Sequence, residues 1–137
     1  MRLLAPVSRG ETDQTALEGE AVFESIGCNS CHRSAFTTGP NANRLFDRSP
    51  VALYSDLLLH GVGTGDGIEQ AAASPDEIRT PALWGLRFRR PLLHDGSAPA
   101  IEDAIRRHQG EARNITFRFL ALTEEDRQRL LSFLNSL

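Results

Sequence analysis

The motif Cys28-Asn29-Ser30-Cys31-His32 constrains this chain of 137 residues more than any other feature. Cys-x-x-Cys-His is the attachment site of a c-type haem, in which both thiols form thioethers with the haem vinyl groups. The two residues between Cys28 and Cys31 match the spacing of the vinyls, and His32 then lies beneath the iron as its proximal ligand. The sequence therefore predicts one covalently attached haem c held by Cys28, Cys31 and His32.

Three simpler interpretations of the cysteine pair fit the rest of the sequence less well. A thioredoxin-like dithiol would need a βαβ context, which the Gly-rich, helix-poor middle of the chain does not offer. A zinc site needs four ligands, and the sequence has no second cysteine pair. A disulfide across two residues would be strained. Haem attachment is the interpretation that we retain.

Length and charge limit both the domain count and the kinds of partner. A chain of this size has no room for a second core, so we expect residues 1–14 to be a flexible tail or linker stub and residues 15–137 to form one domain. The net charge of −3 is too small to indicate binding to nucleic acid or a membrane surface. No segment is apolar enough to span a bilayer.

Haem is attached covalently on the outer side of the cytoplasmic membrane, so we expect a periplasmic or outward-facing protein. No signal peptide is visible, because residues 1–6 lack an apolar run of adequate length. We therefore expect the chain to be a mature form or a part cut from a longer protein.

Apolar spacing predicts a helix near each end of the chain. Residues 15–26 form the first, and residues 123–137 form the second, which opens with a sequence that resembles a capping box. Gly19 would let another helix cross at close range, and Phe23 would fill the crossing point. This pattern resembles that of class I cytochromes c. The predicted fold is all-α and cytochrome c-like, with crossing N- and C-terminal helices and the haem in the core.

Shorter elements are predicted between these two helices. Residues 50–60 and 98–109 have helical apolar spacing, and each segment ends at a glycine. Residues 61–67 contain a glycine at every second position and are expected to form a flexible loop. This loop lacks the strand–turn–helix context of a nucleotide site, so no phosphate role is predicted for it.

The residue on the second face of the iron determines the haem potential and whether the iron can bind substrate. The only methionine is Met1, in the expected tail, and the chain has no lysine. The remaining candidates are His60, His94, His108, Tyr54 or an open site, so the haem is predicted to be either bis-His or five-coordinate. Both His60 and His108 end an apolar stripe of a predicted helix, so spacing alone leaves the choice between them open.

Several segments occur in the order found in one family of haem proteins. They are the Gly-x-x-x-Phe-x-x-x-x-Cys-x-x-Cys-His stretch, Leu53-Tyr54-Ser55-Asp56-Leu57-Leu58-Leu59-His60, Arg79-Thr80-Pro81-Ala82-Leu83-Trp84-Gly85-Leu86, Leu93-His94-Asp95-Gly96-Ser97, Ile101-Glu102-Asp103-Ala104-Ile105, His108-Gln109-Gly110-Glu111-Ala112 and the leucine-rich terminus. On these segments the chain resembles the C-terminal haem domain of the bacterial di-haem cytochrome c peroxidase superfamily, especially its thiol oxidoreductase-like branch.

The resemblance implies a role for several residues. In the peroxidases a methionine downstream of the His-Asp-Gly motif is the distal ligand of the electron-transferring haem, and His108 occupies that position here. His108 is therefore the implied distal ligand, with His60 as the alternative. His94 is expected to organise its loop or to bond a haem propionate. Arg79 and Trp84 are placed for similar work, although surface solvation and core packing would also explain them.

The chain also departs from these relatives. It carries one Cys-x-x-Cys-His motif where they carry two, and it has Gly61-Val62-Gly63 after His60 where they often have Asp-Met-Gly. Peroxidase activity is therefore not carried over. The arginine-rich run 87–90 is expected to be a solvated face, although it could also steer an acidic redox partner.

We expect a monohaem c-type cytochrome, bis-His and of low potential, that passes single electrons to a partner protein or a fused enzyme domain and is not itself an enzyme. Two alternatives remain. One is a haem with an open or labile distal site that acts on peroxide or a small ligand. The other is the electron-entry domain of a larger oxidoreductase.

Overall fold

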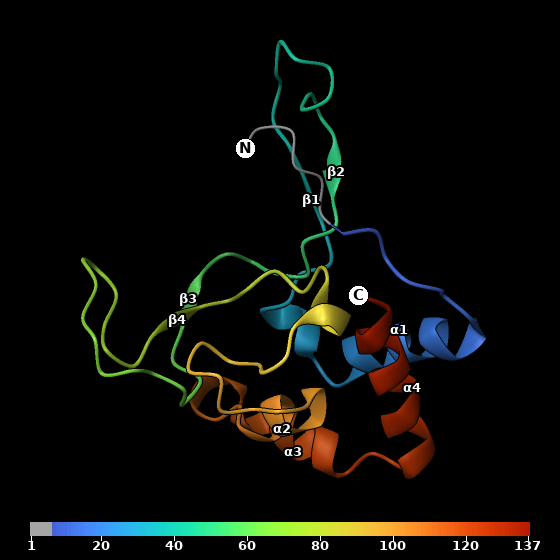
Figure 1. The fold of residues 1–137 in the computed structure, drawn as a ribbon, viewed down its shortest axis with the longest axis vertical. Coiled ribbons are helices and arrows are strands. Elements are labelled where there is room, and N and C mark those ends of the chain that lie inside the picture. Colours follow the sequence, from blue (N-terminus) through green and yellow to red (C-terminus); the bar gives the residue numbers. More distant parts are fainter. Residues whose placement is uncertain (1–6) are drawn as a thin grey trace.

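The computed structural model describes residues 7–137, so Met1 and the first part of the expected tail lie outside the described residues (Figure 1). In chain order the elements are α1 (Gln14–Ser25), the 3₁₀ helix η1 (Cys28–Ser30), β1 (Phe36–Thr37), β2 (Pro50–Val51), β3 (Leu59–His60), β4 (Ile78–Arg79), η2 (Leu86–Phe88), α2 (Ile101–Arg106), η3 (Gly110–Ala112), α3 (Arg113–Leu120) and α4 (Glu124–Ser136). β1 pairs antiparallel with β2, and β3 with β4. The regular secondary structure of the described chain is mainly helical with short strands, so the all-α prediction holds only in part.

The two terminal helices begin at side-chain caps, close to where the sequence predicts them. The carboxylate of Asp13 accepts a hydrogen bond from Ala16 N at 2.8 Å at the start of α1. The hydroxyl of Thr123 accepts one from Asp126 N at 3.1 Å at the start of α4. Each cap satisfies a backbone N–H that has no partner within the helix.

α1 and α4 pack directly against each other (Figure 1). A Cβ on Gly19 would overlap the carbonyl oxygen of Arg129 and lie 2.9 Å from the Cβ of Phe133. Beside this point the rings of Phe23 and Phe133 lie 5.2 Å apart, centroid to centroid. The predicted crossing, with glycine at the contact and phenylalanine filling it, is confirmed.

The core combines side chains of these two helices and of α3 with buried residues from the middle of the chain, such as Tyr54, Leu86 and Ile101. Phe119 of α3 and Leu130 and Phe133 of α4 have no exposed surface. α3 is not predicted from the sequence, although the buried residues Ala112, Thr116 and Phe119 recur at helical spacing and could have indicated it.

The helix predicted over residues 50–60 is wrong. The N–H groups of Tyr54, Ser55 and Asp56 donate instead to the carbonyl oxygens of residues 34, 33 and 31, at 3.2, 2.9 and 2.8 Å. Tyr54 and Leu57 adopt left-handed backbone conformations, with φ of 51° and 63°, which a right-handed helix does not contain. The backbone of this segment therefore pairs with the residues around the Cys-x-x-Cys-His motif and not with itself.

The other two predictions for the middle of the chain are closer. The helix predicted over 98–109 is present but shorter, because α2 starts only at Ile101. Ala98 is held before it by two backbone hydrogen bonds with Leu92, of 2.7 and 3.2 Å. Residues 61–67 contain no helix or strand, as predicted.

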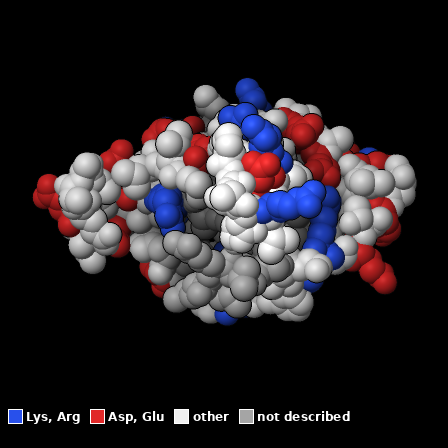
Figure 2. Space-filling model, turned by 90° about the horizontal axis from the view of Figure 1, so that it is seen from above, with Lys and Arg blue, Asp and Glu red and all other residues white. Residues whose placement is uncertain are grey.

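The arginines of the run 87–90 bind backbone carbonyls, so they are only partly the expected solvated face. Arg87 donates to the carbonyl oxygens of Ser8, Ser136 and Leu137, at 2.6 to 3.1 Å. Arg90 donates to the carbonyl oxygen of Leu86 at 3.1 Å. On the face in Figure 2 the described arginines are mixed with acidic residues, so that face does not form a single basic field.

Candidate haem site

The Cys-x-x-Cys-His motif forms one tight turn directly after α1. Gly27 ends the helix with φ of 95°, a left-handed conformation that favours glycine. The amide of His32 then donates to the carbonyl oxygen of Cys28 at 2.9 Å. The turn holds both cysteines and His32 together, and the two half-buried thiols are free, with no disulfide between them.

Burial raises the pKa of both thiols. The pKa of Cys28 reaches about 12, and that of Cys31 is raised by burial and then by the charges of Asp56 and Glu111. A reactive dithiol needs the opposite shift, because the thiolate is the attacking species. The thiols are therefore protonated at neutral pH, which argues against the redox-dithiol interpretation.

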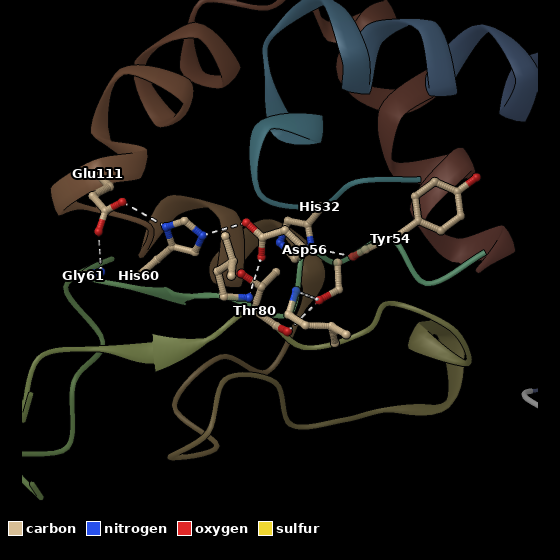
Figure 3. A network of polar contacts seen from close by, with 10 residues as sticks. His32, Tyr54, Asp56, His60, Gly61, Thr80 and Glu111 are labelled. Atoms are coloured by element: carbon tan, nitrogen blue, oxygen red, sulfur yellow. Dashed lines mark hydrogen bonds and ion pairs between the residues drawn. The ribbon is translucent and has the colours of Figure 1, made fainter. Parts of the chain in front are cut away.

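His32 presents one ring nitrogen with a free lone pair. Its Nδ1 lies 2.9 Å from the carbonyl oxygen of Tyr54 (Figure 3). A carbonyl can only accept a hydrogen bond, so Nδ1 carries the proton and Nε2 is unprotonated. Burial lowers the pKa of His32 to about 4, against the opposing effect of this bond. The ring is thus neutral, as a metal ligand must be.

Tyr54 belongs to the His32 side of the site. Its phenol donates to Glu20 Oε1 at 2.6 Å, and its ring packs against Phe23 and Phe133, with centroids 6.2 and 5.6 Å away. Burial raises the pKa of the phenol, and the bond to Glu20 raises it further. The phenol is therefore engaged at a carboxylate, which argues against Tyr54 as a distal ligand, while its carbonyl orients His32.

We expect Tyr54→Phe to lower the free energy of unfolding by about 1.5 kcal/mol. The variant keeps the aromatic packing and loses only the hydrogen bond to Glu20. The matched control is Ser25→Ala, which removes an exposed hydroxyl bonded at 2.8 Å to the carbonyl of Val22; it should change stability by less than about 0.5 kcal/mol. Urea denaturation followed by circular dichroism measures both, and equal losses would contradict the expectation.

His108 has the same ring arrangement as His32. Its Nδ1 lies 2.7 Å from the carbonyl oxygen of Ala104, so Nδ1 is the donor and Nε2 is left free. The backbone of His108 is fixed as well, because Thr116 Oγ1 donates to its carbonyl oxygen at 2.6 Å. The charges of His108 and of His60 both act to lower the pKa of His32, so this effect does not distinguish between the two rings.

His60 has no free ring nitrogen. Its Nε2 lies 2.8 Å from Asp56 Oδ2 and its Nδ1 lies 2.9 Å from Glu111 Oε2 (Figure 3). The bond to Glu111 and then the bond to Asp56 raise the pKa of His60. An imidazole that donates to carboxylates from both nitrogens has no lone pair to offer a metal. The geometry therefore disfavours His60 as the distal ligand.

The remaining candidates have other surroundings, although Arg79 pairs with Leu59, the residue before His60. His94 is partly exposed, and its Nε2 lies 3.9 Å from Asp66 Oδ2 of the glycine-rich loop. Arg79 is exposed in β4, and Trp84 is half-buried just before η2. The site also contains Asp56 and Glu111, which were not singled out from the sequence. The four-residue spacing of Asp56 and His60 is a signal that could have paired them.

The donor set fits a c-type haem. Two free thiols in one turn, followed by a neutral imidazole with Nε2 unprotonated, supply the attachment points and the proximal ligand. A different metal site is suggested by Cys31, Asp56 and His60, whose ligand atoms lie within 4.8 Å of one another. That trio suits a metal less well, because the thiol is protonated and the other two side chains are bonded to each other.

Comparison with known proteins identifies the family. The family model described as "Di-haem oxidoreductase, putative peroxidase" matches residues 1–137. The chain therefore belongs to the di-haem oxidoreductase family. This confirms the resemblance inferred from the sequence and places the chain in a family of haem-binding oxidoreductases.

Two solved structures share the fold. The chain is similar to the hydrazine synthase of Kuenenia stuttgartiensis, with a TM-score of 0.68 and 22% identity over 99% of this chain and 52% of that chain. It is also similar to a MauG-like protein associated with microbial copper homeostasis, with a TM-score of 0.56 and 21% identity over 93% of this chain and 47% of that chain. This chain thus spans about half the length of each. A search of curated proteins finds no match.

Within residues 7–137 no helix has the length and apolar character needed to cross a bilayer.

Proposed function

We propose that this chain is a monohaem c-type cytochrome that transfers single electrons, with the haem attached to Cys28 and Cys31 and ligated by His32 and His108. One observation carries the proposal. Of the four histidines, His32 and His108 are the two whose Nδ1 donates to a backbone carbonyl, which leaves Nε2 free for the iron. One haem is proposed, although the family is named for two, because the chain has a single Cys-x-x-Cys-His motif.

The bound haem would supply a one-electron redox centre. The protein's part is to hold both imidazoles in one tautomer, through the carbonyls of Tyr54 and Ala104, so that the ligands stay in place when the oxidation state changes. Two donating imidazoles favour ferric iron, so we propose a potential below that of His/Met cytochromes. Arg79, Trp84 and His94 remain proposed contacts of the haem propionates, with His94 also serving its loop.

The proposed location is the periplasm or another compartment outside the cytoplasmic membrane. Covalent attachment at Cys28 and Cys31 takes place there, and the family is typically extracytoplasmic.

A second candidate is the electron-entry domain of a larger oxidoreductase. It is supported by the solved neighbours, each about twice the length of this chain. In that case the electron would pass to or from a fused domain, and the redox partner would be part of the same protein.

The test is spectroscopy on protein produced in a host that attaches haem c. Mass spectrometry should find one haem bound covalently. Absorption and EPR spectra should show a low-spin iron in the ferric state, and the ferrous protein should bind carbon monoxide slowly. A high-spin signal with rapid carbon monoxide binding would favour an open distal site with peroxidase-like chemistry, and a polypeptide without haem would refute both.

A further inference from the structure

His60, which the proposed ligation does not use, is the centre of a bridge between two carboxylates. Asp56 and Glu111 bind its two ring nitrogens at 2.8 and 2.9 Å (Figure 3). The side chains of Asp56 and His60 are only 12% and 16% exposed, so solvent screens the bond between them little. A donor to two carboxylates must be an imidazolium, and such charge-assisted bonds are the strong ones.

One end of this bridge is fixed to the haem-attachment turn. The amide of Asp56 donates to the carbonyl oxygen of Cys31 at 2.8 Å. The carboxylate of Asp56 is oriented by the amide of Leu58, which donates to Oδ1 at 3.0 Å and leaves Oδ2 for His60. The position of His60 therefore depends on the segment that pairs with Cys31.

The other end is fixed to the residues directly after His108. Glu111 Oε1 accepts from the amide of Gly61 at 2.8 Å, while its own amide donates to the carbonyl oxygen of Gly61 at 3.0 Å. The amide of Gln109 donates to the carbonyl oxygen of Val62 at 2.8 Å. Gly110 makes this close pairing possible, because its φ is 52° and a Cβ there would overlap the carbonyl oxygen of Gly61.

We propose that Asp56, His60 and Glu111 form a latch that positions His108 on the distal side, by tying residues 109–111 to the turn that holds the haem. The inference rests on the proposed function. These three are positioning residues, since none of them would touch the iron. The latch connects the haem-attachment turn, at Cys31, with Glu111, which lies three positions after His108.

The charge state of the latch gives it a pH dependence with a definite sign. His60 faces the carboxylates of Asp56 and Glu111. Its other titratable neighbours are Glu77, His32 and the thiol of Cys31. Because the fold raises the pKa of His60, the stabilisation is fully present below the ordinary pKa of 6.5 and is lost as pH rises through the raised one. A neutral ring keeps one N–H, so one of the two carboxylates then loses its donor.

The test compares Glu111→Ala with Glu77→Ala in the haem-loaded protein. Both variants remove a carboxylate that interacts with His60, but Glu77 is not bonded to it and accepts instead from the amide of Ser74 at 2.8 Å. The readout is the rate at which carbon monoxide binds the ferrous protein, which reports how often His108 leaves the iron. Glu111→Ala should raise this rate about tenfold, since one charge-assisted bond is lost, and Glu77→Ala should leave it within about twofold.

Further variants separate the possible outcomes. Glu111→Gln keeps an acceptor for Gly61 without the charge and should fall between wild type and Glu111→Ala. If wild type is already high-spin, the proposed function fails. If wild type is low-spin and Glu111→Ala folds, judged by its melting curve, but binds carbon monoxide at the wild-type rate, the latch is overturned. Should Glu111→Ala not fold, His60→Ala, which removes both ring donors, provides the same comparison.

Discussion

Replacing His108 with alanine should convert the ferric haem from low-spin to high-spin and open the iron to carbon monoxide. Alanine has no donor atom, and the Nε2 that the structure leaves free at position 108 is lost with the ring. The ferrous variant should bind carbon monoxide at least about a hundredfold faster than wild type, because no imidazole has to dissociate from the iron first. Each factor of ten in rate corresponds to about 1.4 kcal/mol. EPR and stopped-flow absorption measure the two effects.

The other histidines supply the controls. His94→Ala should stay low-spin, because His94 is partly exposed and faces Asp66. His60→Ala should also stay mainly low-spin, with a faster carbon monoxide rate because the latch is broken, but without full conversion. If His60→Ala alone gave the high-spin spectrum, the distal ligand would be His60 and both of its present bonds to carboxylates would have to be absent from the haem-loaded protein.

The features that could be predicted are those determined by residues close together in the sequence. The attachment motif places its three functional residues within one turn. The crossing of α1 and α4 could be predicted because Gly19 and Phe23 have a distinctive spacing. Thr123 could be predicted as a cap because its partner Asp126 is three residues away.

The segment 50–60 could not be predicted in this way, because its conformation is determined by distant residues. Its leucine spacing is compatible with a helix, but its amides bond to residues 31–34. In this segment the backbone hydrogen bonds to residues 31–34 override the local preference for a helix. The same pairing places the Tyr54 carbonyl that orients His32. The contacts that build the site are therefore also the reason why the helix prediction is wrong.

The choice between His60 and His108 likewise needed three-dimensional information. Both end an apolar stripe in the sequence, and family position alone favours His108. The structure adds the partners of each ring: a carbonyl for His108, and two carboxylates for His60. Since Glu111 is far from His60 in sequence, no spacing rule could show that both nitrogens of His60 are occupied.

Gly19→Ala should destabilise the fold strongly, and the sign of the effect is informative. At an open position inside a helix, alanine is favoured over glycine by about 1 kcal/mol. Gly19 lies in the middle of α1, but its added Cβ would overlap the carbonyl oxygen of Arg129. Backbone atoms of α4 cannot yield as a side chain could, so the helices must separate. We expect the free energy of unfolding to fall by about 3 kcal/mol, a large part of the stability of a small domain.

The matched substitution is Gly39→Ala, where a Cβ would meet nothing within 4 Å. Alanine there should leave the stability unchanged or raise it by about 0.5 kcal/mol, by restricting the unfolded chain. Urea denaturation of the two variants, followed by circular dichroism, compares the same chemical change at a closed and an open position. Because α1 leads directly into the turn of Cys28 and His32, Gly19→Ala should also lower the yield of haem-loaded protein. A Gly19→Ala protein as stable as the Gly39→Ala protein would mean that α1 and α4 are not in close contact at Gly19, and that the helix preceding the haem-attachment turn packs differently.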